Sequence, residues 1–442
     1  MIDKAKNILA KLENAGFKSY IVGGFVRDLV MGKNSTDIDI ATEARPEQIK
    51  KVFASYKLVD IGQRFGTIKV IDGAESFEIT SFREEKSYKD KRHPEKISFA
   101  KTIEEDLSRR DFTINAMAIR NDKTIDPFGG KIDIEKKIIR AVGDPYKRIG
   151  EDYLRALRAV RFASILDFEI EKDLKKAIRY YNKNIAYISK ERIQDEFTKI
   201  ILCQRPDQAI RLMDDLGLLG QIFPEIEMLK GFDQHSVHHY LDVYDHTLEV
   251  LKNTPEDLVT RISALFHDVG KPHTFFLDEN GQGRFFGHQN ISKDICEKRL
   301  RDLRFSKIII EDVCLLIKRH MDAANTYTEK SVARLFRKLG EENLIRLLDL
   351  QAADKLATNN KDLSNIENAR KILSDLKNKD IPKSRKDLAI NGHDLIKVGY
   401  KEGKDIGKIL KLVEENVFYG SLANNRDDIL DFIRSKAQNL DR

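Results

Sequence analysis

The sequence lacks several features that would place it in a special class of proteins. It has three cysteines, Cys203, Cys296 and Cys314, which lie far apart, so neither a disulfide framework nor a zinc ribbon is indicated. No stretch reaches the roughly 18 consecutive apolar residues of a membrane-spanning helix. The lysine-rich N-terminal segment lacks the apolar core of a secretory signal, and internal repeats and low-complexity segments are absent. We therefore expect a globular, cytoplasmic protein without membrane contact.

The order of sequence patterns predicts several domains. A chain of 442 residues exceeds what one ordinary core holds. Short β-type runs alternate with helices up to about residue 140, and helical periodicity then continues almost to the end. The predicted class is α+β, with a small mixed sheet and helices followed by an all-helical part. The expected domains are a head, a helical neck, a helical body and a helical tail, at residues 1–140, 141–225, 226–375 and 376–442.

Strand signals concentrate in the first part of the chain. Tyr20–Val22 and residues 66–71 and 77–83 are predicted strands, and Asp72-Gly73 is a predicted hairpin turn. The apolar pair Val52-Phe53 is interpreted as a further short strand.

A glycine pair and two aspartates lie close together near the start of the chain. Gly23 and Gly24 end the first β-type run where a helix pattern begins, and Arg27 follows in that helix. Backbone N–H groups at such a turn, together with a bidentate arginine, favour phosphate binding. Asp37 and Asp39 are two apart in a β-like stretch, so both carboxylates leave one face, where Mg²⁺ suits oxygen ligands beside phosphates. The pattern predicts a nucleotidyl-transfer site.

Two further segments of the head add candidate residues. Glu78 lies on a predicted strand that faces the same surface as the aspartate pair, where it would complete metal coordination or orient the attacking hydroxyl. Arg110 is placed to reach phosphate or ribose, and Asp111 is expected to cap the next helix rather than to hold Arg110. The charged loop of residues 84–96 is expected to move.

The segment Glu151–Arg161 is predicted to form one helix with a charged face. Asp152, Arg155, Arg158 and Arg161 recur every three residues, and arginines without lysine favour planar, bidentate recognition. Cytosine and adenine each present an amine donor beside a ring-nitrogen acceptor, which a carboxylate such as Asp152 and an arginine such as Arg155 can match. Such a face would accept CTP and ATP and reject GTP and UTP without a template.

Histidines and aspartates recur along the predicted helical body. Neighbouring His and Asp side chains can bind one ion together only at a helix end, and this combination suits a transition metal that activates water for phosphoester hydrolysis. A basic segment follows, because residues 370–411 contain 12 Lys or Arg against 6 Asp or Glu, as expected for an RNA partner. The predicted metal ligands are His246, His267, Asp268, His288, His320 and Asp354.

Together these motifs resemble the class II tRNA nucleotidyltransferase and poly(A) polymerase family of bacteria over nearly the whole chain. Residues 23–28 match G-G-x-V-R-D, Asp37 and Asp39 match D-x-D, residues 109–111 match R-R-D, and residues 151–155 match E-D-x-x-R. The body resembles an HD-type phosphohydrolase domain. Residues 388–396 resemble the family's RNA-contacting end, although His393 stands where an asparagine is expected.

The resemblance implies a head of the DNA polymerase β type and a role for each candidate residue. Asp37 and Asp39 would hold Mg²⁺, and a transition metal or Mg²⁺ would occupy the HD site. The implied activity is addition of C, C and A to the tRNA 3′ end from CTP and ATP by two-metal transfer, with no obligate protein partner. The implied nucleotide-binding residues are Gly23, Gly24, Arg27, Arg110, Asp152, Arg155, Arg158 and Arg161.

Three other interpretations stay open at this stage. The same head site would serve a poly(A) polymerase or an enzyme that adds only A. Alternatively, the body is the main catalyst, a metal-dependent phosphodiesterase that uses the head to grip RNA. The third interpretation is an RNA-binding protein with inactive sites, and the intact carboxylate sets argue against it.

Overall fold

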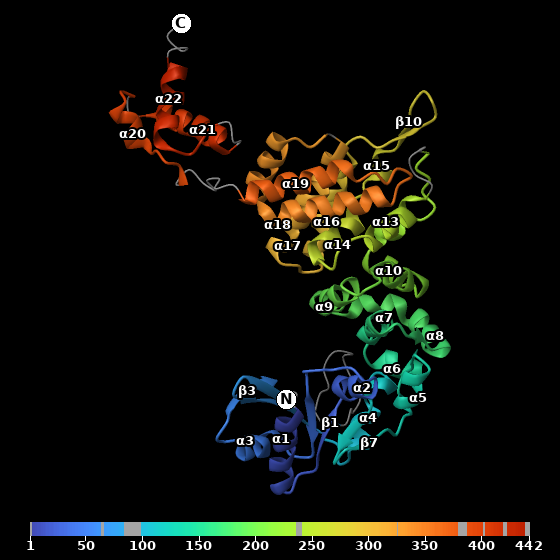
Figure 1. Cartoon of the computed structure of the whole chain (residues 1–442). Helices are drawn as coiled ribbons and strands as arrows, with labels where there is room; N and C mark the ends of the chain where they lie inside the picture. Colours follow the sequence, from blue (N-terminus) through green and yellow to red (C-terminus); the bar gives the residue numbers. More distant parts are fainter. Residues whose placement is uncertain are drawn as a thin grey trace. The chain divides into compact units, whose positions relative to one another are not determined.

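The computed structural model describes residues 2–62, 66–83, 99–235, 241–324, 326–378, 387–400, 403–418 and 422–437. The predicted loop at residues 84–96 therefore lies outside the described residues. Two compact units make up the chain, Met1–Glu227 and Met228–Arg442, and Figure 1 labels their helices and strands. The α+β class is confirmed. The finer division into head, neck, body and tail stays a proposal.

A seven-stranded sheet forms the head, in the order β3-β4-β5-β2-β1-β6-β7. Strands β2 and β5 run parallel, whereas the other neighbouring strands are antiparallel. Apolar residues alternate along β4 and β5, so that Ile68, Val70, Phe77 and Ile79 are buried in the core. The strands are β1 (Ser19–Val22), β2 (Asp39–Thr42), β3 (Lys57–Gly62), β4 (Thr67–Asp72), β5 (Glu75–Ser81), β6 (Ala118–Arg120) and β7 (Lys123–Ile125).

Short helices connect these strands. The predicted strand at Val52-Phe53 is wrong. Val52 is the last residue of the helix α3, and the buried Phe53 caps its C-terminus. Two apolar residues do not distinguish a strand from a helix end, whereas Pro46 in the first turn was the available helix signal. The helices are α1 (Ile2–Asn14), α2 (Gly24–Val30), α3 (Pro46–Val52), α4 (Ile103–Ser108) and α5 (Gly130–Glu135), with the 3₁₀ helix η1 (Thr113–Asn115).

Helices make up most of the remainder of the first unit. The single helix predicted over residues 151–161 is wrong, since α6 ends at Glu151 and α7 begins at Leu154. Asp152 between them is extended, and its Oδ1 accepts a hydrogen bond from the Leu154 N–H at 3.1 Å, which competes with a continuous helix. The elements are α6 (Pro145–Glu151), α7 (Leu154–Leu166), α8 (Lys172–Tyr181), η2 (Asn182–Tyr187), α9 (Lys190–Ile201), α10 (Pro206–Asp215), α11 (Leu219–Ile222) and α12 (Pro224–Glu227), and the short strands β8 (Ile138–Ile139) and β9 (Glu169–Ile170) pair in parallel.

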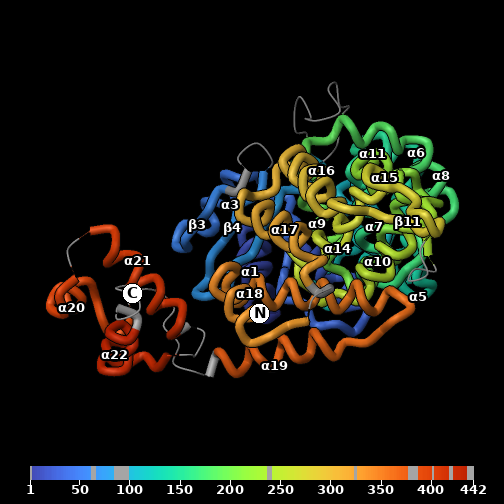
Figure 2. Tube along the Cα trace, turned by 90° about the horizontal axis from the view of Figure 1, so that it is seen from above, coloured from blue at the N-terminus to red at the C-terminus, as the bar shows by residue number. Residues whose placement is uncertain are grey.

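The second unit is almost entirely helical. Helix α16 packs against α17, and α18 runs beside α19, as both Figure 1 and Figure 2 show. Leu395, Val413 and Ile429 belong to a separate small apolar cluster of the last three helices. Within the described part of the chain, no helix has the length and apolar character to cross a membrane. The elements are α13 (Val243–Lys252), α14 (Leu258–Phe266), α15 (Lys271–Thr274), β10 (Phe276–Leu277), β11 (Gly283–Arg284), α16 (His288–Asp302), α17 (Lys307–Arg319), η3 (His320–Ala324), α18 (Glu329–Leu356), α19 (Ser364–Asn378), α20 (Gly392–Lys397), α21 (Lys404–Phe418) and α22 (Arg426–Ala437).

Candidate functional site

The first candidate site lies on the sheet of the head. Asp39 begins β2, and the parallel pairing with β5 places it directly opposite Glu78. Asp37 precedes β2, so the expectation that both aspartates lie in a strand is wrong in that detail. The pKa of Asp39 is raised to about 6, first by burial and then by the carboxylates of Asp37 and Glu78. Because a divalent cation would relieve this crowding of negative charge, the donor set fits Mg²⁺.

Gly23 brings the glycine turn close to these carboxylates. Its φ of 76° and ψ of −140° form a combination that glycine adopts readily and other residues do not. A Cβ atom added at Gly23 would lie 3.1 Å from Nη1 of Arg110 and 3.5 Å from Oδ2 of Asp39. Three segments that are distant in the sequence therefore meet at one place in the head.

Each arginine of this region is oriented by an acidic or amide group. Arg27 donates from Nη1 to Oδ1 of Asn115 at 2.9 Å and from Nη2 to Oδ1 of Asp28 at 2.7 Å. Arg110 lies 3.4 Å from Oδ2 of Asp106 through its Nη2 atom. The two guanidinium groups are thus held in place beside the glycine turn.

Asp111 has a role other than the predicted helix cap. Its Oδ2 accepts a hydrogen bond from Nε of Arg158 at 2.8 Å, and η1, which follows it, has no side-chain cap. Burial alone would raise the pKa of Asp111, but the charge of Arg158 and its hydrogen bond hold that pKa below its usual range. The capping prediction is wrong because one oxygen of the carboxylate binds the Arg158 guanidinium and the other accepts from the adjacent Phe112 N–H at 2.8 Å, which lies before the first turn of η1.

Asp106 is expected to make the stability of the protein depend on acidity. Burial would raise its pKa, but Arg109 and Arg110 together hold the pKa below its usual range. Its unfolded-state pKa is about 3.9, so ionised Asp106 stabilises the fold above about pH 4, and this contribution is lost as the pH falls through the folded-state pKa. The free energy of unfolding, measured by chemical denaturation between about pH 2 and 6, should depend less on pH for Asp106→Asn than for the wild type. Glu104→Gln, an exposed change on the same helix, is the control, and identical slopes for Asp106→Asn and the wild type would contradict the role.

The two residues expected to read the base, Asp152 and Arg155, are both paired. Arg192 donates to Oδ2 of Asp152 at 2.7 Å. Nη1 of Arg155 donates to Oε2 of Glu151 at 2.6 Å and to the Arg148 carbonyl at 2.8 Å. These pairs fix the side chains in position, so the charged surface beside α7 is preformed.

Two residues that the sequence reasoning missed connect the arginines of α7. Glu196 is 4% exposed, and its Oε2 lies 2.9 Å from Nε of Arg161. The Phe162 ring lies 4.3, 5.3 and 5.5 Å from the guanidinium carbons of Arg161, Arg27 and Arg158. Cation–π contacts of this kind place three positive groups around one ring.

The second candidate site brings together the six predicted ligands of the body. Two groups of three have their donor atoms within 4.8 Å of one another, and these are His246, His267 and Asp354, and Asp268, His288 and His320. The two oxygens of Asp268 face the two groups, since Oδ2 lies 3.1 Å from Nε2 of His267 and Oδ1 lies 3.2 Å from Nε2 of His288. The donors therefore suit two metal ions rather than the single ion expected from the sequence.

Hydrogen bonds to the backbone fix the orientation of three of the histidine rings. Nδ1 of His267, His288 and His320 lies 2.7–2.8 Å from the backbone carbonyl three residues earlier. This contact places the proton on Nδ1 and leaves Nε2 as the ligand atom. Burial is the largest cause that lowers the pKa of His320, to about 4, and it keeps the ring neutral. Nε2 of His267 is buried and makes no well-aligned hydrogen bond, although Oδ2 of Asp268 lies 3.1 Å away, and such a gathering of donor atoms fits a metal.

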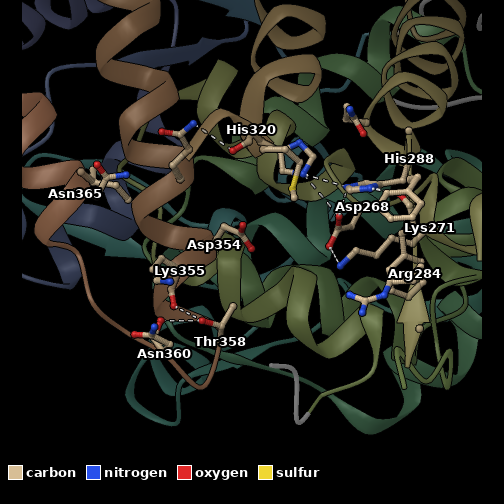
Figure 3. Close-up of a pocket in the computed structure, with 18 of the residues that line it drawn as sticks. Asp268, Lys271, Arg284, His288, His320, Asp354, Lys355, Thr358, Asn360 and Asn365 are labelled. Atoms are coloured by element: carbon tan, nitrogen blue, oxygen red, sulfur yellow. Dashed lines mark hydrogen bonds and ion pairs between the residues drawn. The ribbon is translucent and has the colours of Figure 1, made fainter. Parts of the chain in front are cut away.

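The ends of two helices position these ligands. Helix α14 ends at Phe266, so His267 and Asp268 lie at its C-terminus, as the sequence predicted. Gly270 then lets the chain pass close to α16, where an added Cβ would collide with the carbonyl oxygen of His288. A cavity of about 710 Å³ opens beside the ligands, and Figure 3 shows Asp268, His288, His320 and Asp354 in its wall.

Comparison with known protein families covers most of the chain in separate segments. Residues 19–140 match the poly A polymerase head domain, residues 167–229 match the probable RNA and SrmB-binding site of polymerase A, and residues 284–433 match the putative domain 2 of tRNA nucleotidyltransferase.

Whole-chain relatives decide the family. A CCA-adding enzyme of Ligilactobacillus salivarius is 33% identical over 440 residues, which cover 97% of this chain and 95% of the relative. The chain belongs to the CCA-adding enzyme family. A second CCA-adding enzyme, from Lactobacillus delbrueckii subsp. bulgaricus, is 35% identical over 432 residues, with 97% of each chain covered. The crystal structure of the Bacillus stearothermophilus CCA-adding enzyme in complex with CTP covers 99% of this chain and 98% of its own, with a TM-score of 0.74 and 27% identity. As a member of the CCA-adding enzyme family, the chain is a nucleotidyltransferase, and the predicted resemblance is confirmed.

Proposed function

We propose that this chain adds C, C and A to the 3′ end of tRNA from CTP and ATP and releases pyrophosphate. The proposal rests on the meeting of Asp39, Glu78, Gly23 and Arg110 in the head of a chain whose full-length relatives are CCA-adding enzymes. The B. stearothermophilus complex supports CTP as a substrate, and the match of residues 284–433 supports tRNA.

In the head, the carboxylates would bind the metal and the arginines would bind the triphosphate. Asp37 and Asp39, with Glu78 beside them, would hold Mg²⁺. Two such ions, when bound, would supply activation of the 3′-hydroxyl and neutralisation of the triphosphate charge. Arg27 and Arg110 would bind the triphosphate through their N–H groups, together with the backbone of the glycine turn. Their fixed positions would align the α-phosphorus for in-line attack.

Base selection is assigned to the residues around α7. Asp152 would accept a hydrogen bond from the exocyclic amine, and Arg155 would donate to the ring nitrogen, while Arg158 and Arg161 would complete the pocket. This assignment explains how CTP and ATP are accepted while UTP and GTP are rejected.

Asp152→Ala is expected to relax this selection. Since a wrong base contact costs about 1–3 kcal/mol, misincorporation of UTP or GTP relative to CTP should rise at least about fivefold. Single-nucleotide addition to a tRNA primer measures the ratio. Asp195→Ala is the control, because it removes an exposed carboxylate from α9 and should leave the selection unchanged. Unchanged discrimination in Asp152→Ala would mean that the base is read elsewhere.

Extension of a tRNA transcript that lacks its last three nucleotides tests the main proposal. With Mg²⁺, CTP and ATP, we expect C-C-A to be added and the reaction to stop. Addition of A alone, or of long A tracts, would instead assign an A-adding enzyme or a poly(A) polymerase.

We further propose that the body hydrolyses phosphoesters in a metal-dependent reaction. The supporting observation is the convergence of six ligand side chains, three of them with Nδ1 fixed by the backbone. A transition metal or Mg²⁺ bound there would activate water as the nucleophile. In this proposal the body is a second active centre, and the head is more than a grip for RNA.

A further inference from the structure

A short β-hairpin places aromatic side chains at the cavity of the body. Strand β11 ends at Arg284, and Phe285 and Phe286 lead directly to His288 at the start of α16. Phe286 lines the cavity although it is 77% exposed, and its ring centroid lies 5.8 Å from that of Phe276, which is 46% exposed. Two large apolar rings thus face solvent, and one of them, Phe286, lies in the lining of the cavity beside the candidate metal ligands.

Positive charge lies on the same side of the cavity. Lys271 is 6% exposed, and its Nζ lies 2.7 Å from Oδ2 of Asp268 and 2.7 Å from Oε1 of Gln234. Nη2 of Arg284 lies 2.7 Å from Oδ2 of Asp278, within the hairpin. Figure 3 shows Lys271 and Arg284 on the side of Asp268, so a phosphate at the metal position would meet two cations.

The opposite wall of the cavity is polar, and the charged Lys355 and Asp362 lie among its amide and hydroxyl groups. Thr358, Asn360 and Asn365 line it, across from Arg284 in Figure 3. Amide and hydroxyl groups of this kind both donate and accept hydrogen bonds, as the hydroxyl groups of a sugar do. The cavity volume of about 710 Å³ suits one small ligand, because such sites usually measure roughly 300–1,000 Å³.

We infer that the cavity binds a nucleoside phosphate, with its phosphate beside Lys271 and Arg284 and its base stacked on Phe286. Exposed aromatic faces next to a cationic groove are the usual combination for stacking a base while holding its phosphate. The chain order supports the assignment, since Arg284, Phe286 and His288 lie on one continuous segment. The inference rests on the proposed phosphohydrolase function and adds the residues that choose its substrate.

The balanced reaction is simple. The oxygen of water forms a new bond to phosphorus, the bond from phosphorus to the sugar oxygen breaks, and the proton that water loses is taken up by that sugar oxygen. Nucleoside and inorganic phosphate are the products. Phe286 touches only the base, so it contributes to binding and specificity and not to these bond changes.

AMP and ribose 5-phosphate form a matched pair of probes, because they differ at one carbon of the sugar, which carries adenine in AMP and a hydroxyl in ribose 5-phosphate. Binding to the full-length protein is measured by calorimetry without metal, and hydrolysis is measured with Mn²⁺. For Phe286→Ala we expect binding of AMP to weaken at least about fivefold, with ribose 5-phosphate unchanged. Arg284→Ala should weaken both probes by the same factor. Ile308→Ala, a change of an equally exposed apolar residue outside the cavity lining, is the control and should change neither.

The outcomes separate the inference from the function on which it rests. If Phe286→Ala leaves the ratio of AMP to ribose 5-phosphate binding unchanged, the stacking role is overturned even if both probes are hydrolysed. If that ratio depends on Phe286 but the wild type hydrolyses neither probe, the binding site is supported and the phosphohydrolase proposal fails. Because the head is also proposed to bind nucleotides, only the part of AMP binding that responds to Phe286→Ala is assigned to the cavity.

Discussion

Asp39→Asn is expected to lower the rate of CTP and ATP addition by about 1,000-fold. Asp39 stands opposite Glu78 and beside Asp37, in the group of carboxylates that would hold Mg²⁺. A metal ion contributes several kcal/mol of charge stabilisation in phosphoryl transfer, and each 1.36 kcal/mol corresponds to about a tenfold change in rate. Asparagine keeps the shape of the side chain and removes its charge. Single-turnover extension of a tRNA primer at saturating nucleotide concentration measures the effect.

Two comparisons make this test specific. Glu47→Gln, an exposed change on α3 in the same unit, should leave the rate unchanged. Binding of tRNA to Asp39→Asn should be close to that of the wild type, since the residue acts on the reacting phosphate and not on the tRNA body. A rate for Asp39→Asn within tenfold of the wild-type rate would refute the metal-binding role.

Asp268→Asn is expected to reduce phosphoester hydrolysis by the body about 1,000-fold while leaving CCA addition unchanged. One carboxylate oxygen of Asp268 faces His267 and the other faces His288, which belong to different groups of donor atoms. Among the described ligands, Asp268 is therefore the side chain that can serve both groups. Asparagine carries no charge and keeps only one oxygen, so it can serve at most one of the two metal positions, and metal activation of water is worth several kcal/mol. Hydrolysis of a nucleotide substrate with Mn²⁺, and the metal content per chain after dialysis, are the two measurements.

Folding must be checked for this variant, because Asp268 is buried and pairs with Lys271 at 2.7 Å. Thermal unfolding tests whether the body stays folded without that pair. Asp294→Asn, an exposed change on α16, is the control that should keep both metal content and hydrolysis. Wild-type hydrolysis by a folded Asp268→Asn variant would show that the site works without this carboxylate.

The candidate residues of both sites come in short, recognisable groups in the sequence, and the structure brings the members of each group together. A glycine turn, a pair of aspartates and a spaced series of histidines each indicate a binding site. These signals do not depend on the structure of the segments that connect them. The position of Asp37 outside β2 and the break at Asp152 were missed, because element boundaries depend on local hydrogen bonds such as that from Leu154 to Asp152.

The supporting contacts around the head site were harder to predict. Asp111 binds Arg158 through a contact that spans 47 residues, and no local pattern specifies such a partner. Glu196 did leave a signal, because it follows Ile193 by three residues and falls on the apolar face with Phe197 and Ile200. A glutamate on a buried helical face needs a cationic partner, so this position was a clue to the arginines of α7.

The backbone contacts of the histidine rings have a consequence for the choice of metal. Each of the three rings is fixed by a carbonyl only three residues away, within its own helix or the adjoining turn. A ring held in this way cannot rotate to suit an ion of different size or preferred geometry. The centre would therefore discriminate among the ions of its surroundings by rigidity, accepting those whose bond lengths match the spacing already present and excluding the others.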